Sequence, residues 1–295
     1  MEGTTLTEII LPAAIALIMF GMGLSLTTQD FYRLFRWPKP IAVGLAGQII
    51  LLPLLAYLLC ITLDLSPIMA AGLMILSACP GGTMSNVISQ LARANLALSV
   101  TLTGFSTLIC LVSTPLIIQF VVSHFLGEQQ VSFSIASVSA SLSAITLIPI
   151  SLGMLVRNYF TEWAITSDTF FRRFSALFMA IMIALILWQE RASLSRSFND
   201  MFLACLLLNL ISMTMGIILA RVFAFNKVDA MTLSIEVGIQ NATLAILIAM
   251  TFLQRPDLAV AAGVYGITMY IGGAFIVFWS KWPAETLNQS SKHRA

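Results

Sequence analysis

Runs of about 20 mostly apolar residues recur along the whole chain, and each is long enough to cross the hydrocarbon core of a bilayer as a helix. Of the 295 residues, 59% are hydrophobic and 9% are charged, whereas soluble domains carry about 25% charged residues. We therefore expect an all-α polytopic membrane protein. No segment between the runs is long enough for a soluble domain, so we expect residues 1–295 to form a single transmembrane domain.

The apolar runs predict nine transmembrane spans, at about residues 7–26, 41–63, 67–91, 96–122, 133–156, 174–189, 201–222, 231–252 and 259–280. The connections are short, and most contain charged residues or proline, as in QDFYRLFRWPKP and QERASLSRSFND. No basic segment precedes the first run, which argues against a cleaved signal peptide and predicts that this run remains a helix.

The basic residues fall mostly on one side of the predicted membrane. If the N-terminus lies outside, twelve of the fifteen Lys and Arg residues are cytoplasmic, and only Arg191, Arg196 and Arg255 are external. This asymmetry follows the positive-inside rule. It predicts a multi-pass protein of a cell inner (plasma) membrane, with its N-terminus outside and its C-terminus in the cytoplasm.

Two of the predicted spans are interrupted. Pro80, Gly81 and Gly82 break the third, and Gly238 stands among polar residues in the eighth. Non-helical backbone at membrane depth is tolerated only where protein or a water-filled cavity satisfies it. Spans that are five apart run in opposite directions, as an inverted repeat requires. Paired broken helices in inverted halves are typical of a substrate and ion site at the membrane midplane.

Glu236 is the only charged residue deep inside a predicted span. A carboxylate near the bilayer centre costs on the order of a few kcal/mol unless it is compensated. Oxygen-bearing side chains are concentrated in three spans: Thr83, Ser85 and Asn86; Ser99, Thr103 and Ser106; Gln240 and Asn241. Hard cations such as sodium prefer oxygen ligands. We interpret this pattern as a buried cation site, and the protein as a secondary transporter.

Two of these segments carry a resemblance to a known family. ACPGGTMSNVISQLARANLALSVTLT and IEVGIQNATLA, at their spacing, resemble the bile acid:sodium symporter family, including its bacterial apical-bile-acid-transporter-like members. The likeness extends from IMFGMGLSL near residue 18 to the last span. It implies a panel part and a core part, with two broken helices crossing in the core. The chain starts where the second helix of that family would, so it resembles the nine-helix form.

The resemblance also implies sites for two sodium ions and for a substrate. Its first sodium site corresponds to Ser85, Asn86, Ser99, Thr103 and Glu236. Its second corresponds to Gln48, Glu236, Gln240 and the backbone oxygens of Val237 and Ile239. Positions near the substrate correspond to Thr83, Met84, Asn241, Met269 and Tyr270. Bacterial relatives often carry a His-Asn pair where Met269 and Tyr270 stand here, so the substrate stays open.

The implied activity is sodium-coupled import of an organic anion by alternating access, the anion being a bile acid or a small carboxylate such as a pantoate-like metabolite. A proton-coupled carrier, with Glu236 carrying the proton, is one alternative. An efflux carrier for a metalloid or another ion, with Cys79 as a thiol ligand, is the other. The four cysteines lie in apolar runs, so we expect no disulfides.

Other classes of function find no support in the sequence. There is no HExxH or GxSxG motif, and the two histidines, His124 and His293, lie at a loop edge and in the tail. We therefore expect no enzyme activity. The basic residues form no patch, so we expect no nucleic-acid binding. The bilayer and a small organic anion are the expected partners, with no obligate protein partner.

Overall fold

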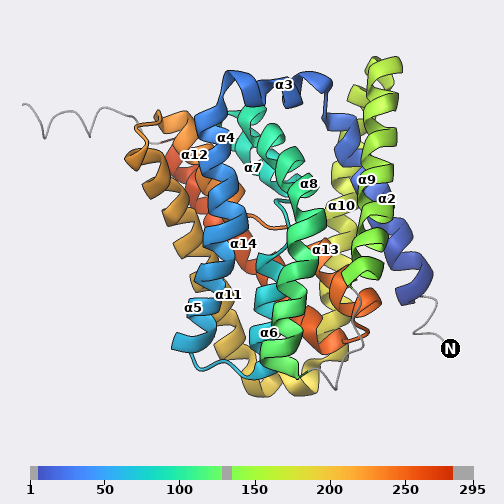
Figure 1. The fold of residues 1–295 in the computed structure, drawn as a ribbon, viewed down its shortest axis with the longest axis vertical. Helices are drawn as coiled ribbons and strands as arrows, with labels where there is room; N and C mark the ends of the chain where they lie inside the picture. The colour runs from blue at the N-terminus through green and yellow to red at the C-terminus, as the bar shows by residue number, and fades with distance from the viewer. Residues whose placement is uncertain (1–5, 128–134, 282–295) are drawn as a thin grey trace, which may run out of the picture.

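The computed structural model describes residues 6–127 and 135–281, and within this part every regular element is a helix (Figure 1). Seven helical segments are long and apolar enough to cross a membrane: Glu8–Ser25, Pro38–Thr62, Leu96–Leu126, Ala136–Tyr159, Thr161–Gln189, Phe198–Val222 and Pro256–Ser280. They correspond to seven of the nine predicted spans. The other two predicted spans, the third and the eighth, each form a pair of shorter helices.

The helices are α2 (Leu11–Ser25), α3 (Thr28–Arg36), α4 (Pro38–Ala46), α5 (Leu52–Thr62), α6 (Pro67–Ser77), α7 (Thr83–Leu91), α8 (Leu96–Val121), α9 (Ile135–Tyr159), α10 (Thr161–Gln189), α11 (Arg191–Val222), α12 (Lys227–Gly238), α13 (Ala242–Leu247) and α14 (Ala259–Ser280). Single π-helical turns precede α2 (Leu6–Ile10), join α4 to α5 (Gly47–Leu51), and extend α8 (Val122–Leu126) and α13 (Ile248–Phe252). A 3-10 turn, Pro256–Leu258, leads into α14.

Three of the segments that connect the predicted spans are largely helical. Residues 157–173 belong mostly to α9 and α10, which are separated only by Phe160, and α11 already begins at Arg191. A helix does not have to stop where its apolar run stops, since its charged side chains can reach water beyond the bilayer. Asp168 and Arg172, one turn apart on α10, form such a polar stretch, with an ion pair of 2.7 Å.

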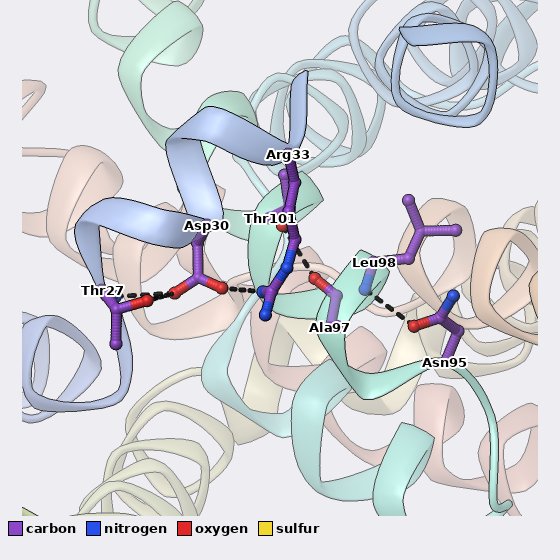
Figure 2. Close-up of polar contacts among 7 residues, drawn as sticks. All are labelled: Thr27, Asp30, Arg33, Asn95, Ala97, Leu98 and Thr101. Carbon is purple, nitrogen blue, oxygen red and sulfur yellow. Dashed lines mark hydrogen bonds and ion pairs between the residues drawn. The ribbon is translucent and has the colours of Figure 1, made fainter. Parts of the chain in front are cut away.

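The third of these connections contains α3, which runs across one end of the helical bundle between α2 and α4 (Figure 1). Asp30 fixes its start: the Thr27 backbone N–H and hydroxyl donate to the carboxylate at 2.6 and 2.7 Å. Arg33 pairs with the same carboxylate (Figure 2). A similar local bond starts α8, where the Asn95 side-chain oxygen accepts from the Leu98 backbone N–H at 3.1 Å (Figure 2).

Two sets of helices make the most extensive contacts, and the packing of α10 against α14 and of α8 against α9 connects them to the rest of the bundle. Helix α2 lies mainly against α9 and α10, whereas α11 lies mainly against α12 and α14. Gly23 and Gly153 allow α2 and α9 to approach closely, because a Cβ atom on Gly153 would lie 2.3 Å from the Phe20 carbonyl oxygen. Small residues serve the same purpose in membrane helix packing generally.

Large apolar side chains also cover the outside of the bundle. Leu54, Leu58 and Ile61 on α5 are 53%, 57% and 57% exposed. Such a stripe is unfavourable in water, so this outer surface fits a lipid environment.

Candidate functional site

The two interrupted segments lie against each other inside the bundle. Residues 78–82, between α6 and α7, and residues 239–241, between α12 and α13, are not helical. Gly81 and Gln240 form an antiparallel bridge, and the Asn241 backbone N–H donates to the Pro80 carbonyl oxygen at 2.9 Å. Each break therefore satisfies part of the backbone of the other.

The space around Gly81 is crowded by two side chains of the candidate site. A Cβ atom there would lie 3.1 Å from both Gln48 Nε2 and Glu236 Oε2. The carbonyl of Gly238, which ends α12, is satisfied from two other helices. It accepts from Asn209 Nδ2 on α11 and from the Tyr265 hydroxyl on α14, both at 2.7 Å. Neighbouring side chains thus stabilise backbone that the break leaves without a helical partner.

The Glu236 carboxylate is fully buried beside these breaks. The Ser99 hydroxyl donates to Oε1, and the Thr103 hydroxyl donates to Oε2 at 3.0 Å. The Gln48 amide donates to the Glu236 backbone oxygen and lies 3.5 Å from Oε2. The ion pairs found in the described part of the chain all lie elsewhere. The carboxylate is therefore stabilised by hydrogen bonds, and no cationic side chain of the described residues forms an ion pair with it.

Oxygen atoms around the carboxylate outnumber the protons available to them. The Ser99 hydroxyl lies 2.9 Å from Asn86 Oδ1 as well as against Glu236 Oε1, yet it has only one proton to donate. Ser85 Oγ lies 3.4 Å from Thr103 Oγ1 and donates to the Gly82 carbonyl at 2.8 Å. The structure thus brings together all five residues predicted for the first sodium site.

Ser89 belongs to the same cluster and was missed by the sequence reasoning. Its hydroxyl is buried and donates to Ser99 Oγ at 3.1 Å. It lies on α7, one turn beyond Ser85. That spacing along one helical face was the available signal.

Several residues predicted for the second sodium site lie beside Gly81: Gln48, Glu236 and the Ile239 carbonyl are within 4 Å of the position that a Cβ atom on it would take, and Gln240 forms the bridge with it. The side-chain oxygens of Gln48 and Gln240 are buried and have no hydrogen-bond partner. The Gln240 amide donates to the Val237 carbonyl at 2.9 Å, and Val237 and Ile239 are fully buried. Leaving a buried acceptor unsatisfied costs about 1–3 kcal/mol, so these two oxygens fit contact with a bound cation.

The donor set also limits the kind of cation. Among the described residues, no group of three or more His, Cys, Asp or Glu side chains lies close enough together to hold a metal ion. One carboxylate with hydroxyl, amide and carbonyl oxygens suits a hard cation such as sodium better than a transition metal. Cys79 is 2% exposed, and its thiol donates to the Ile75 carbonyl at 3.4 Å.

A cavity of about 190 Å³ lies next to the carboxylate cluster, between α7 and α8 on one side and α2, α9 and α10 on the other. Thr83 and Asn86 line it from α7. Asn86 is therefore shared, since it faces the cavity and also contacts Ser99. Thr83 lies where α7 meets α10, with its hydroxyl 3.4 Å from Ser175 Oγ on α10.

The other residues predicted to lie near a substrate are placed differently. The Asn241 side chain caps α13 by accepting from the Leu244 N–H at 3.0 Å. Met269 is buried in the apolar core, and Met84 and Tyr270 pack partly against it. Of the five predicted positions, only Thr83 lines this cavity. The walls from α2, α9 and α10 were missed, because their residues carry no motif that sets them apart in the sequence.

The fold and the site together define a polytopic helical membrane protein with a buried, oxygen-rich centre. Residues 12–197 match the Sodium Bile acid symporter family. The chain belongs to this family, which confirms the resemblance seen in the sequence.

The relatives are named as transporters, not as enzymes. The chain is 32% identical to the probable sodium/metabolite cotransporter BASS2, chloroplastic, of Oryza sativa subsp. japonica, over 89% of this chain and 62% of that protein. It is 31% identical to the uncharacterized sodium-dependent transporter YocS of Bacillus subtilis (strain 168), over 90% and 82%. It is 26% identical to the human ileal sodium/bile acid cotransporter, over 80% and 67%. The chain thus spans 62% of the length of the rice relative.

Proposed function

We propose that this protein is a secondary transporter that imports a small organic anion together with sodium ions. One observation carries the proposal. The buried Glu236 carboxylate faces a surplus of oxygen acceptors, and no cationic side chain of the described residues neutralises it. Family membership agrees with this reading, since relatives are named as sodium-dependent or sodium/metabolite transporters.

Two sodium ions would bind, one on either side of the carboxylate. The first would contact oxygens of Ser85, Asn86, Ser99, Thr103 and Glu236, which lie within hydrogen-bonding distance of one another in a chain of contacts. The second would contact Glu236, the carbonyls of Val237 and Ile239, and the unpartnered oxygens of Gln48 and Gln240. A proton on Glu236 would supply one O–H donor and so could satisfy only one of those two amide oxygens, whereas a cation would contact both, which favours sodium over proton coupling.

Ion and substrate binding would be coupled through α7. Without sodium, the charge on Glu236 disfavours a second negative charge nearby. With sodium bound, that charge is compensated, and the cavity lined by Thr83 and Asn86 becomes favourable for an anion. Because Asn86 contacts both the cluster and the cavity, each ligand would raise the affinity for the other by the same factor.

The same proposal extends to the architecture. The α6–α7 and α12–α13 segments would act as two further spans, giving nine in all and an inverted repeat of broken helices that cross at the midplane. Helices α2, α9 and α10 would form the panel, and the remaining spans the core that rocks against it. The N-terminus would lie outside a bacterial inner membrane, and α3 would lie on the cytoplasmic side.

Uptake into proteoliposomes tests the proposal. Radiolabelled taurocholate and pantoate represent the bile acid and small carboxylate classes. We expect uptake of one class when an inward sodium gradient is imposed, and stimulation by an inside-negative potential if two sodium ions accompany a monoanion. Uptake driven by a proton gradient and indifferent to sodium would refute sodium coupling. Equal uptake with and without any ion gradient would refute coupled transport altogether.

A further inference from the structure

Arg157, near the C-terminal end of α9, is a charged residue that the cation cluster does not use. It is partly buried and lines the cavity beside Thr83 and Asn86. Among the described residues, no ion pair or side-chain hydrogen bond involves its guanidinium; only its backbone carbonyl is engaged, by the Thr161 hydroxyl. An arginine that faces a cavity without a carboxylate partner is available to a ligand.

The other charges on the cavity wall offset each other. Asp168 and Arg172, both on α10, form an ion pair of 2.7 Å. Arg172 also donates to Gln90 Oε1 on α7 at 3.0 Å. Arg157 is left as the unbalanced charge, so the wall carries one net positive charge. This charge favours an anionic group at the α9 end of the cavity.

The rest of the wall suits a small molecule with one charged end. Ile18, Met22, Val100 and Phe171 supply apolar surface, while Thr83 and Asn86 supply polar groups. The volume of about 190 Å³ is below the 300–1,000 Å³ typical of pockets for drug-sized ligands. A molecule of a few carbon atoms fits this space better than a steroid does.

Arg157 also lines a second, more open cavity of about 600 Å³, next to the connection between α2 and α3. Leu26, Thr27 and Gln29 form part of its wall. Arg157 therefore lies at the boundary between an outer space and the inner cavity. The guanidinium is therefore accessible to an anionic group from either space.

We infer that Arg157 binds the anionic group of the transported molecule, and that this molecule is a small organic monoanion, such as a hydroxy-carboxylate. This inference rests on the proposed function. The apolar part of the transported molecule lies against Ile18, Met22 and Phe171, and its hydroxyl groups face Thr83 and Asn86. The planar guanidinium matches a carboxylate with two parallel hydrogen bonds, which a lysine ammonium does not provide.

Thermal stability of the purified full-length protein tests the inference. Sodium is titrated first, and then pantoate or its neutral primary amide is titrated at saturating sodium. We expect Arg157→Gln to keep the sodium midpoint of the wild type. Its pantoate midpoint should rise about 10- to 100-fold, the loss expected for a charge-assisted hydrogen bond. The preference of Arg157→Gln for pantoate over the amide should disappear. The pantoate midpoint of Arg157→Lys should lie between those of the wild type and Arg157→Gln.

Arg173→Gln is the matched control. Arg173 is a neighbouring arginine on α10 that is exposed and does not line the cavity, so this variant should behave like the wild type. A wild-type pantoate midpoint in Arg157→Gln, or an unchanged preference for pantoate over the amide, would overturn the inference. The inference would also be overturned if neither pantoate nor its amide stabilised the wild type, or if Arg157→Gln lost its stabilisation by sodium.

The result also separates this inference from the proposed function. If the wild type showed no sodium effect but still preferred pantoate to its amide through Arg157, sodium coupling would fail and the role of Arg157 would stand. If sodium stabilised all variants and Arg157→Gln still bound pantoate normally, the proposed function would stand and the role of Arg157 would fail.

Discussion

Replacing Glu236 by Gln should stabilise the protein in the absence of sodium and make it insensitive to sodium. The side chain is fully buried, and a charge near the bilayer centre costs on the order of a few kcal/mol. Hydrogen bonds from Ser99, Thr103 and Gln48 offset part of this cost. We therefore expect the sodium-free variant to be more stable than the wild type by about 1–3 kcal/mol, since the amide retains an acceptor but no charge.

Sodium should reverse this order. At a sodium concentration 100 times its Kd, binding to one site stabilises the wild type by about 2.7 kcal/mol, and binding to a second site adds to that. The amide variant should gain little, because both proposed ions depend on the carboxylate. At about 2–4 °C per kcal/mol, the variant should melt about 2–12 °C above the wild type without sodium and below it in excess sodium.

The assay is a melting curve in detergent, with choline replacing sodium at constant ionic strength. Glu162→Gln is the control, because it makes the same chemical change at an exposed position on α10. It should leave both melting temperatures unchanged. If Glu236→Gln kept the full sodium response, the carboxylate would not be a ligand. If it were less stable than the wild type without sodium, the carboxylate would not be an uncompensated charge.

Two further substitutions test the break region and its support. Gly81→Ala would place a methyl group 3.1 Å from the Gln48 amide nitrogen, so we expect about tenfold weaker sodium binding in a thermal titration. Gly263→Ala, whose Cβ atom would meet its nearest neighbour at an ordinary 3.9 Å, should bind sodium normally, and equal affinities in the two variants would contradict the argument from crowding. Tyr265→Phe removes one of the two donors to the Gly238 carbonyl and should destabilise the protein by about 1 kcal/mol; an unchanged melting temperature would show that this bond does not stabilise the break.

The sequence alone was sufficient to recognise a helical membrane protein and its family. Both depend on local information: apolar runs of membrane length, and two motifs that stand intact in the chain. The break after α6 followed from Pro80, Gly81 and Gly82, because proline and glycine act on their own backbone wherever they occur. The prediction of a cation site was also local, because it rested on the residue types of Glu236 and the oxygen-bearing side chains near it in the sequence.

The tertiary structure alone decided which of these groups meet. Ser99 and Glu236, which are 137 positions apart, form a hydrogen bond. Gln240 meets Gly81 across the two breaks. Hydropathy gives the number of apolar segments but not their neighbours in space. Hydropathy also does not predict where a helix ends, because backbone hydrogen bonding can continue in polar segments, as in α3 and the first part of α10.

The cavity shows most clearly the difference between what the sequence determines and what helix packing decides. Arg157 resembles any other basic residue at the end of an apolar run, and from the sequence it served only to orient the chain in the membrane. Its position beside Thr83 and Asn86 results from the packing of α2, α9 and α10 against α7 and α8. Residue types and helical segments are therefore encoded locally, whereas the sharing of one cavity by distant side chains depends on how the helices pack.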